Sequence, residues 1–282
     1  MMPAQTTKPR VSFMGAALRI WDLSLGQMLW SRRSVFLGLL VGGPVLLSAL
    51  VRIVRAMTPL GRLAVNGADV GGPAIFGMMI WLLYVRFIIP VLGVFYGTAL
   101  IADEVEDKTI TYLFTRPIPR GAVLVGKYLA YLSCTVLLIL PSVVLVYFLM
   151  VPIGGGSIGA SFPSLMTDLG LLALGLAAYG AVFSLVGAWL KRPLVIGLVF
   201  AFGWEPGVLI FPGYLKQLTV AYYLQGLVPH AMPDDSSISA ILQVFREVPA
   251  AVTCLAALAV ITLGTLALAA RAVEKREYVL EQ

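Results

Sequence analysis

One stretch of the chain comes close to a nucleotide-binding loop. Residues 121–128 (GAVLVGKY) nearly follow the pattern G-x-x-x-x-G-K-[ST], in which backbone amides and a lysine hold phosphates. Tyr128 cannot replace the small hydroxyl that coordinates magnesium, and the segment opens an apolar run instead of following a buried strand. We therefore predict that this chain has no nucleotide site, and that a partner chain binds any ATP that is used.

The residue types that most often catalyse reactions or bind metals are scarce and isolated. His230 is the only histidine, lies in a proline-rich turn, and has no serine partner in a recognisable nucleophile motif. Cys134 and Cys254 lie in apolar runs without metal-ligand spacing or a nearby general base. Met78-Met79 is the nearest approach to a soft-metal cluster, but methionine in apolar helices is usually packing filler. We predict no catalytic residue, no cofactor and no metal in this chain, which is therefore not expected to be an enzyme.

The elements that carry these residues are predicted to be membrane helices. Of the 282 residues, 60% are hydrophobic and 12% charged, which is too apolar for a soluble fold to hide. The sequence predicts an all-α polytopic membrane protein, and no cleavable signal peptide is visible at its start. Apolar runs near the length that crosses a bilayer predict six spans, at about 34–54, 74–101, 122–150, 166–190, 193–212 and 248–270.

An even number of spans places both termini on one side, and the basic residues indicate which side. Fourteen of the twenty Lys and Arg fall in the termini, in the segment between the second and third spans, and in the turn before Pro193. This bias predicts that these segments are cytoplasmic. The protein itself is expected in the plasma (inner) membrane of a prokaryote. The domains would be a cytoplasmic N-terminus (1–33), a six-helix membrane domain (34–270) and a cytoplasmic tail (271–282). The net charge of +6 then indicates contact with membrane lipid rather than nucleic acid.

Three segments outside the spans have a character of their own. Residues 11–30 repeat apolar side chains at helical spacing, which predicts an amphipathic helix on the membrane surface, with Trp21 and Trp30 as interfacial anchors. Residues 152–165 are expected to form an uncharged Gly/Ser loop. Residues 213–247 contain an aromatic amphipathic stretch, which could dip into the outer leaflet or line a cavity mouth. The alternative is an interfacial helix that only seals the bundle.

Two charged residues lie well away from the ends of predicted spans, where charges are costly and usually functional or paired. Arg86 lies in the second span, four residues before Pro90, and Glu205 lies in the outer half of the fifth. One interpretation is that they line the substrate route. The other is that they pair with each other or with polar backbone and stabilise the bundle.

Residues 101–127, here called the charged island, are the only strongly charged segment between two long apolar stretches. Acids come first and bases last, an order that suits the dipole of a short helix. Tyr112, Leu113 and Phe114 add an apolar stripe that a plain solvated loop does not need. This pattern predicts a short amphipathic helix that docks into the groove of a cytoplasmic partner.

The island (E-x-E-D-K-T-I-x-Y-L-x-x-R-P-I-x-R, ending in Gly126-Lys127) resembles the cytoplasmic signature of type-2 ABC transporter permeases. The chain is similar in particular to the branch with six spans and no large external domain. The resemblance implies a coupling helix that sits in a cleft of a separate ATPase subunit, and a smaller contact at the Lys191-Arg192-Pro193 turn. The implied contact residues are Glu104, Glu106, Asp107, Lys108, Thr109, Tyr112, Leu113, Arg116, Pro117, Arg120, Lys191 and Arg192.

The resemblance also implies partners and a mechanism. Two ATPase subunits, which carry ATP and magnesium, would work with two permease copies, identical or homologous. Their closure on ATP would move the bundle, whose glycines Gly170, Gly175, Gly180 and Gly187 permit close, adjustable packing. The apolar spans favour export of a hydrophobic or amphiphilic cargo. An alternative function is a membrane anchor or scaffold for a larger cytoplasmic or envelope assembly that transports no solute of its own.

Overall fold

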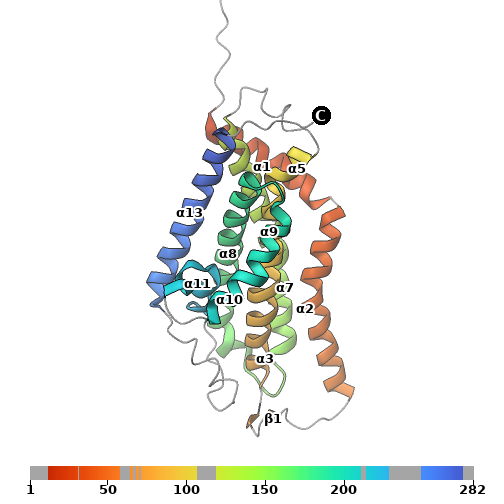
Figure 1. The fold of residues 1–282 in the computed structure, drawn as a ribbon. Helices are drawn as coiled ribbons and strands as arrows, with labels where there is room; N and C mark the ends of the chain where they lie inside the picture. Colours follow the sequence, from red (N-terminus) through yellow and green to blue (C-terminus); the bar gives the residue numbers. More distant parts are fainter. Residues whose placement is uncertain are drawn as a thin grey trace, which may run out of the picture.

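The computed structural model of the chain describes residues 12–30, 32–57, 64–65, 68–69, 71–106, 119–210, 214–228 and 249–275. These residues are almost entirely helical, and the long helices run side by side as a bundle (Figure 1). The exception is a small antiparallel pair of strands, β1 (Ala64–Val65) and β2 (Ala68–Asp69), at one end of the bundle. The prediction of an all-α polytopic fold is confirmed.

Five helical segments are long and apolar enough to cross a bilayer, and a sixth is shorter. The long ones are Val35–Met57 within α2 (Arg32–Met57), Gly72–Glu104, α7 (Arg120–Met150), α8 (Ile158–Trp189) and α13 (Ala251–Lys275). Gly72–Glu104 comprises α3 (Gly72–Met79), η1 (Ile80–Ile88), α4 (Ile89–Leu92), η2 (Gly93–Gly97) and most of α5 (Ala99–Glu106). The shorter segment, Pro193–Val208, comprises α9 (Pro193–Val199), η3 (Phe200–Trp204) and the start of α10 (Glu205–Ile210).

The fourth span begins eight residues earlier than the sequence predicted, so the loop expected at 152–165 is shorter. Gly154 and Gly155 adopt φ values of 75° and 83°, which glycine reaches without steric cost, and they turn the chain after α7. The Ser157 hydroxyl then accepts a hydrogen bond from the Ala160 amide and caps α8. Pro163 is tolerated in the helix because it lies close to this exposed end.

The ends of the chain that the structure describes lie together. Figure 1 shows α1 (Phe13–Leu29), the end of α5, the start of α7 and the end of α13 at one end of the bundle. The strands β1 and β2 and the last turn of α2 lie at the opposite end. The arrangement brings together the segments that the sequence places on one side of the membrane.

Helix α1 lies against α7, where a tryptophan makes a specific contact. The Trp21 indole N–H donates a hydrogen bond to Ser133 Oγ at 3.1 Å, and Ala16 and Ala17 are buried against Ala122. The side chain of Trp30 is 94% exposed, as an interfacial anchor requires. One of the two predicted anchors is thus bound to the bundle, while the other remains open to its surroundings.

Tyrosine hydroxyls join the helices of the core by hydrogen bonds. Tyr131 on α7 donates to the Leu176 carbonyl at 3.1 Å, and Tyr128 donates to the Ala177 carbonyl at 2.9 Å, both on α8. Tyr84 on η1 lies 2.6 Å from the Ser142 hydroxyl of α7. These bonds satisfy polar groups that would be costly to leave unpaired inside a bilayer.

Glycines on α8 set how closely its neighbours approach. A Cβ atom at Gly187 would lie 2.3 Å from the Thr98 carbonyl oxygen, and one at Gly180 would lie 2.1 Å from the Tyr131 ring. Gly175 would contact Ile89 and Leu224 at 3.1 and 3.2 Å. Gly170 has nothing within 4 Å. Three of the four glycines that the sequence suggested for close packing therefore have that environment in this chain.

We expect Gly187→Ala to destabilise the purified chain by about 1–3 kcal/mol, because the new methyl group would meet rigid backbone. The matched control is Gly170→Ala in the same helix, which meets no neighbouring atom and adds helix propensity. Thermal unfolding in detergent measures both variants. Equal melting temperatures for the two would contradict this account of the contact between α8 and Thr98.

Candidate functional site

The structure describes the two flanks of the charged island. Helix α5 ends at Glu106 and α7 begins at Arg120. Of the predicted contact residues, Asp107, Lys108, Thr109, Tyr112, Leu113, Arg116 and Pro117 lie outside the described residues. Glu106 belongs to α5, but only its backbone is described. Glu104 and Arg120 are therefore the predicted contacts of the island whose side chains the structure places.

An ion pair joins the flanks. The Lys127 ammonium on α7 binds Glu104 Oε1 on α5, and the two side chains are 13% and 25% exposed. Partial burial strengthens this attraction relative to a fully exposed pair. The pair holds the end of α5, where the island begins, close to the start of α7, where it ends.

The returning flank is also tied to α1 and α13. A guanidinium nitrogen of Arg120 donates to the Glu274 carbonyl of α13 at 3.4 Å. A Cβ atom at Gly126 would lie 2.6 Å from the Ala17 carbonyl oxygen, so α1 can cross α7 only where that residue is glycine. The near match to a nucleotide-binding loop is therefore a continuous helix whose second glycine serves packing.

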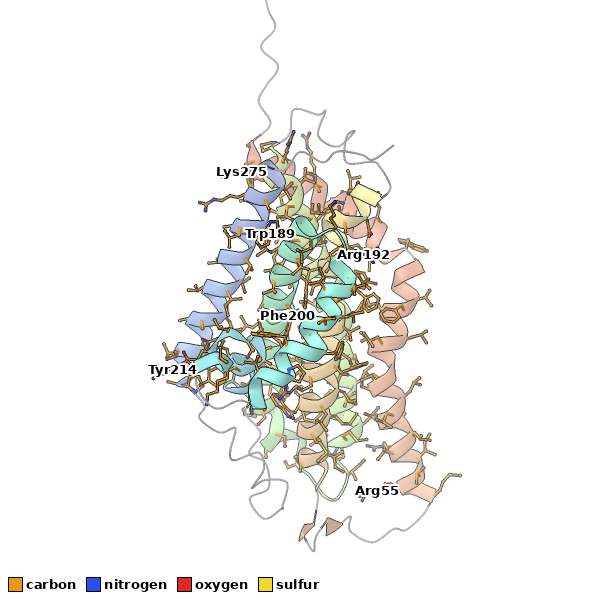
Figure 2. The ribbon with its side chains drawn as sticks, viewed as in Figure 1. Arg55, Trp189, Arg192, Phe200, Tyr214 and Lys275 are labelled. Carbon is orange, nitrogen blue, oxygen red and sulfur yellow. The ribbon has the colours of Figure 1, made fainter. Side chains whose placement is uncertain are left out.

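The second predicted contact lies beside the first. Lys191 and Arg192 are exposed in the bend between α8 and α9 (Figure 2). They line a cavity of about 610 Å³ together with Asp103 of α5. Two segments nearly ninety residues apart in the sequence thus meet at one end of the bundle.

The intramembrane charge Glu205 is buried in a network of hydrogen bonds. Its side chain is 2% exposed, and it accepts hydrogen bonds from the Tyr179 hydroxyl of α8 and from the Val220 amide at 3.1 Å. Val220 begins α11 (Val220–Gln225), which follows η4 (Tyr214–Leu218). Glu205 therefore joins the aromatic stretch after the fifth span to the bundle.

Arg86 does not form a close ion pair with Glu205. Its guanidinium lies over the Trp81 ring, 5.0 Å from the ring centroid, an arrangement that favours a cation. The two charges attract each other electrostatically, but within the described ranges no salt bridge within 4 Å joins them. The pairing of Arg86 is thus with an aromatic face, which the sequence argument did not foresee.

Both charges lie at widened turns next to prolines. The Ile89 amide, just before Pro90, donates to the Tyr84 carbonyl five residues back, and the Glu205 amide, just before Pro206, donates likewise to Phe200. A proline cannot donate to the usual carbonyl four residues back and its ring crowds that carbonyl. A π-turn accommodates the break, and such turns often occur at functional sites.

Two further polar residues of interest were not singled out from the sequence. Asp168 is fully buried on α8, and Tyr179 is the hydroxyl donor to Glu205. Asp168 carries a visible signal, since it is an acid inside a predicted span. Tyr179 carries none, because a tyrosine in an apolar helix does not reveal its partner. Within the described ranges, no three His, Cys, Asp or Glu side chains gather as metal ligands, and Cys134 and Cys254 are buried free thiols.

We expect Glu104→Lys and Lys127→Glu each to destabilise the chain by roughly 1–3 kcal/mol, since each places like charges together at a partly buried position. The double exchange Glu104→Lys/Lys127→Glu restores the pair and should recover most of the loss. A double-mutant cycle on melting temperature tests this. Additive losses in the double variant would show that the two side chains do not interact.

We expect Tyr179→Phe to lower the free energy of unfolding by about 1–3 kcal/mol, because Glu205 loses a buried donor. The control is Tyr214→Phe, whose side chain is 86% exposed and should change stability little. Limited proteolysis in detergent adds a local measurement: cleavage near α11 should accelerate in Tyr179→Phe alone. Unchanged stability and cleavage would remove the proposed fastening of α11.

Comparison with known proteins identifies the family of the chain. The model of the ABC-2 family transporter proteins matches residues 5–272, nearly the whole chain. No curated protein matches the chain significantly. The match spans α1, all six membrane segments and the flanks of the charged island. The chain therefore belongs to the ABC-2 transporter family and is a membrane permease subunit of an ABC transporter.

Proposed function

We propose that a separate ATPase drives this permease by docking on residues 104–120 and on Lys191-Arg192. The observation that carries the proposal is that the part of α5 just before residue 104 meets the α8–α9 bend at one end of the bundle, around the cavity that Asp103, Lys191 and Arg192 line. A single cytoplasmic partner can contact both segments at once. The predicted contact residues whose side chains the structure describes all lie at this end of the bundle.

The flanks of the island are built to pass movement into the membrane. Lys127 binds Glu104 on α5, Arg120 bonds to α13, and Gly126 seats α1 on α7. A displacement of the docked island would therefore pull on four helices together. Rigid helices joined by such contacts can transmit the movement of a closing ATPase to the other end of the bundle.

The distribution of charge supports an orientation with this end in the cytoplasm. Figure 2 shows Arg192 and Lys275 near the end that carries the flanks, and Arg55 at the opposite end. The described end with the flanks also carries Arg120, Lys127, Lys191 and Arg271. An excess of Lys and Arg marks cytoplasmic segments, so both termini would lie on the cytoplasmic side of a prokaryotic plasma membrane.

The partners and cofactors follow from the family. ATP and Mg²⁺ would bind to two ATPase subunits, and a second permease copy, identical or homologous, would complete the assembly. Glu205 is buried in its network, and many exposed side chains of the described membrane helices are apolar. Few buried charges in an apolar bundle favour a hydrophobic or amphiphilic cargo, and we propose that the permease exports it.

The docking proposal predicts that Leu113→Asp/Arg116→Glu abolishes co-purification of the ATPase, because it places a charge in the middle of the apolar stripe and reverses a charge of the island. The chain itself should keep its melting temperature and its level in the membrane. Affinity purification from native membranes, followed by identification of bound chains, measures the loss. Arg62→Glu, a charge reversal predicted to lie on the other side, is the control.

Retention of the ATPase by the double variant would refute docking at the island. Recovery of wild-type chain with partners that hydrolyse no ATP would instead favour the role of a membrane anchor or scaffold. A bound ATPase whose rate of hydrolysis responds to no solute would point the same way.

A further inference from the structure

The lining of the cavity beside the α8–α9 bend has an apolar part and a charged part, and the charged part is here called the rim. Residues of α2, η2, α5 and α9 line it, and its volume of about 610 Å³ is in the range of small-ligand sites. The cavity is otherwise lined mainly by apolar residues. Its lining includes Phe36, Phe95, Leu194 and Val195.

The charged groups are at the rim. Lys191 and Arg192 supply two cations and Asp103 one carboxylate, so the described rim carries a net positive charge. Both basic side chains are exposed and can turn toward a ligand. A planar guanidinium with several donors suits a phosphate in particular.

Neighbouring residues place this rim at the level of lipid headgroups. Trp189, the last residue of α8, lies just before the bend and is 69% exposed. Tryptophan is typical of membrane interfaces. The bend separates two helices that enter the membrane, α8 and α9. Figure 2 shows Arg192 at the end of α9 near α5, with the side chains between α9 and α2 below it.

The apolar side of the cavity continues along helices that face lipid. The rings of Phe36 on α2 and Phe95 on η2 pack with centroids 5.2 Å apart, and both line the cavity. Beyond them, Leu39 on α2 and Val199 on α9 are exposed apolar side chains. A ligand whose anionic head meets the rim therefore finds an apolar path for a hydrocarbon chain.

We propose that this cavity binds an anionic phospholipid, with its phosphate on Lys191 and Arg192 and the start of an acyl chain against Phe36 and Phe95. The net positive rim selects an anionic head over a zwitterionic one, since Asp103 offsets only one of the two cations. The apolar lining selects a lipid over a soluble phosphate. The lipid is a ligand of the isolated permease, so the proposal depends neither on the ATPase nor on the identity of the cargo.

Native mass spectrometry of the purified, delipidated chain without any ATPase tests the proposal. The probes are dioleoylphosphatidylglycerol, dioleoylphosphatidylcholine and glycerol 3-phosphate. We expect phosphatidylglycerol to bind more tightly than phosphatidylcholine, and glycerol 3-phosphate to bind weakly. Equal binding of the two lipids would overturn the electrostatic selection, and tight binding of glycerol 3-phosphate would assign the site to a soluble anion.

Variants then locate the site. Lys191→Gln/Arg192→Gln should weaken binding of phosphatidylglycerol roughly 30-fold, from the usual contribution of two basic residues near an anionic membrane. The matched control is Arg271→Gln/Lys275→Gln, which removes two exposed basic residues of α13 and should leave binding nearly unchanged. Equal losses in the two double variants would show a general charge effect and refute the site.

A space-filling change separates lipid binding from ATPase docking. Ala99 lines the cavity on α5 but is no predicted contact of the ATPase. Ala99→Phe should displace the lipid while both cations remain and while the ATPase still co-purifies. Full lipid binding in this variant would place the lipid elsewhere. If the variant fails to fold, the comparison of lipids on the wild-type chain still decides the proposal.

Discussion

A polar group inside a bilayer has no water to bond with, and in this protein that requirement decides where the helices touch. An unpaired backbone or side-chain group in hydrocarbon costs several kcal/mol, so each one has to meet a partner from the protein. Tyr131 meets a carbonyl of α8, and Glu205 meets α8 and α11 at once. The glycines of α8 then let the backbones come close enough for these bonds to form. Hydrogen bonding and close packing thus depend on each other.

The prolines of the spans leave backbone carbonyls that also need a partner, and they change the helix geometry around Arg86 and Glu205. Pro90 and Pro206 each lack a donor, and the preceding amide reaches five residues back instead of four. The wider turn rotates the side chains that follow it relative to a regular helix. Arg86 and Glu205 sit at these turns, so their directions depend on proline positions as much as on their own chemistry. The result brings Glu205 to Tyr179 and leaves Arg86 over Trp81.

The sequence could predict whatever depends on apolar length or charge, but not what depends on how helices pack. The spans near α2, α7 and α13 follow directly from hydropathy. The sequence also shows that Glu205 lies in a span, where an acid is energetically costly. Its partners could not be predicted, because Tyr179 and Val220 are brought to it only by the fold. The start of α8 was placed late because a Gly/Ser run is typical of a loop, whereas Ser157 here caps a helix. Glu104 and Lys127 were both expected in the island, but their pairing depends on how α5 packs beside α7.

The two proposals meet at Lys191 and Arg192, and thermodynamics connects them. A phosphate held by these cations and an ATPase docked on them use the same charges, so each ligand alters the affinity of the other. The effect is reciprocal: the factor by which lipid changes docking equals the factor by which docking changes lipid binding. A bend that is exposed to both the headgroup layer and the cytoplasm is where such a connection is physically simplest. On this argument the composition of the inner leaflet would act on the permease at the point where the ATPase does.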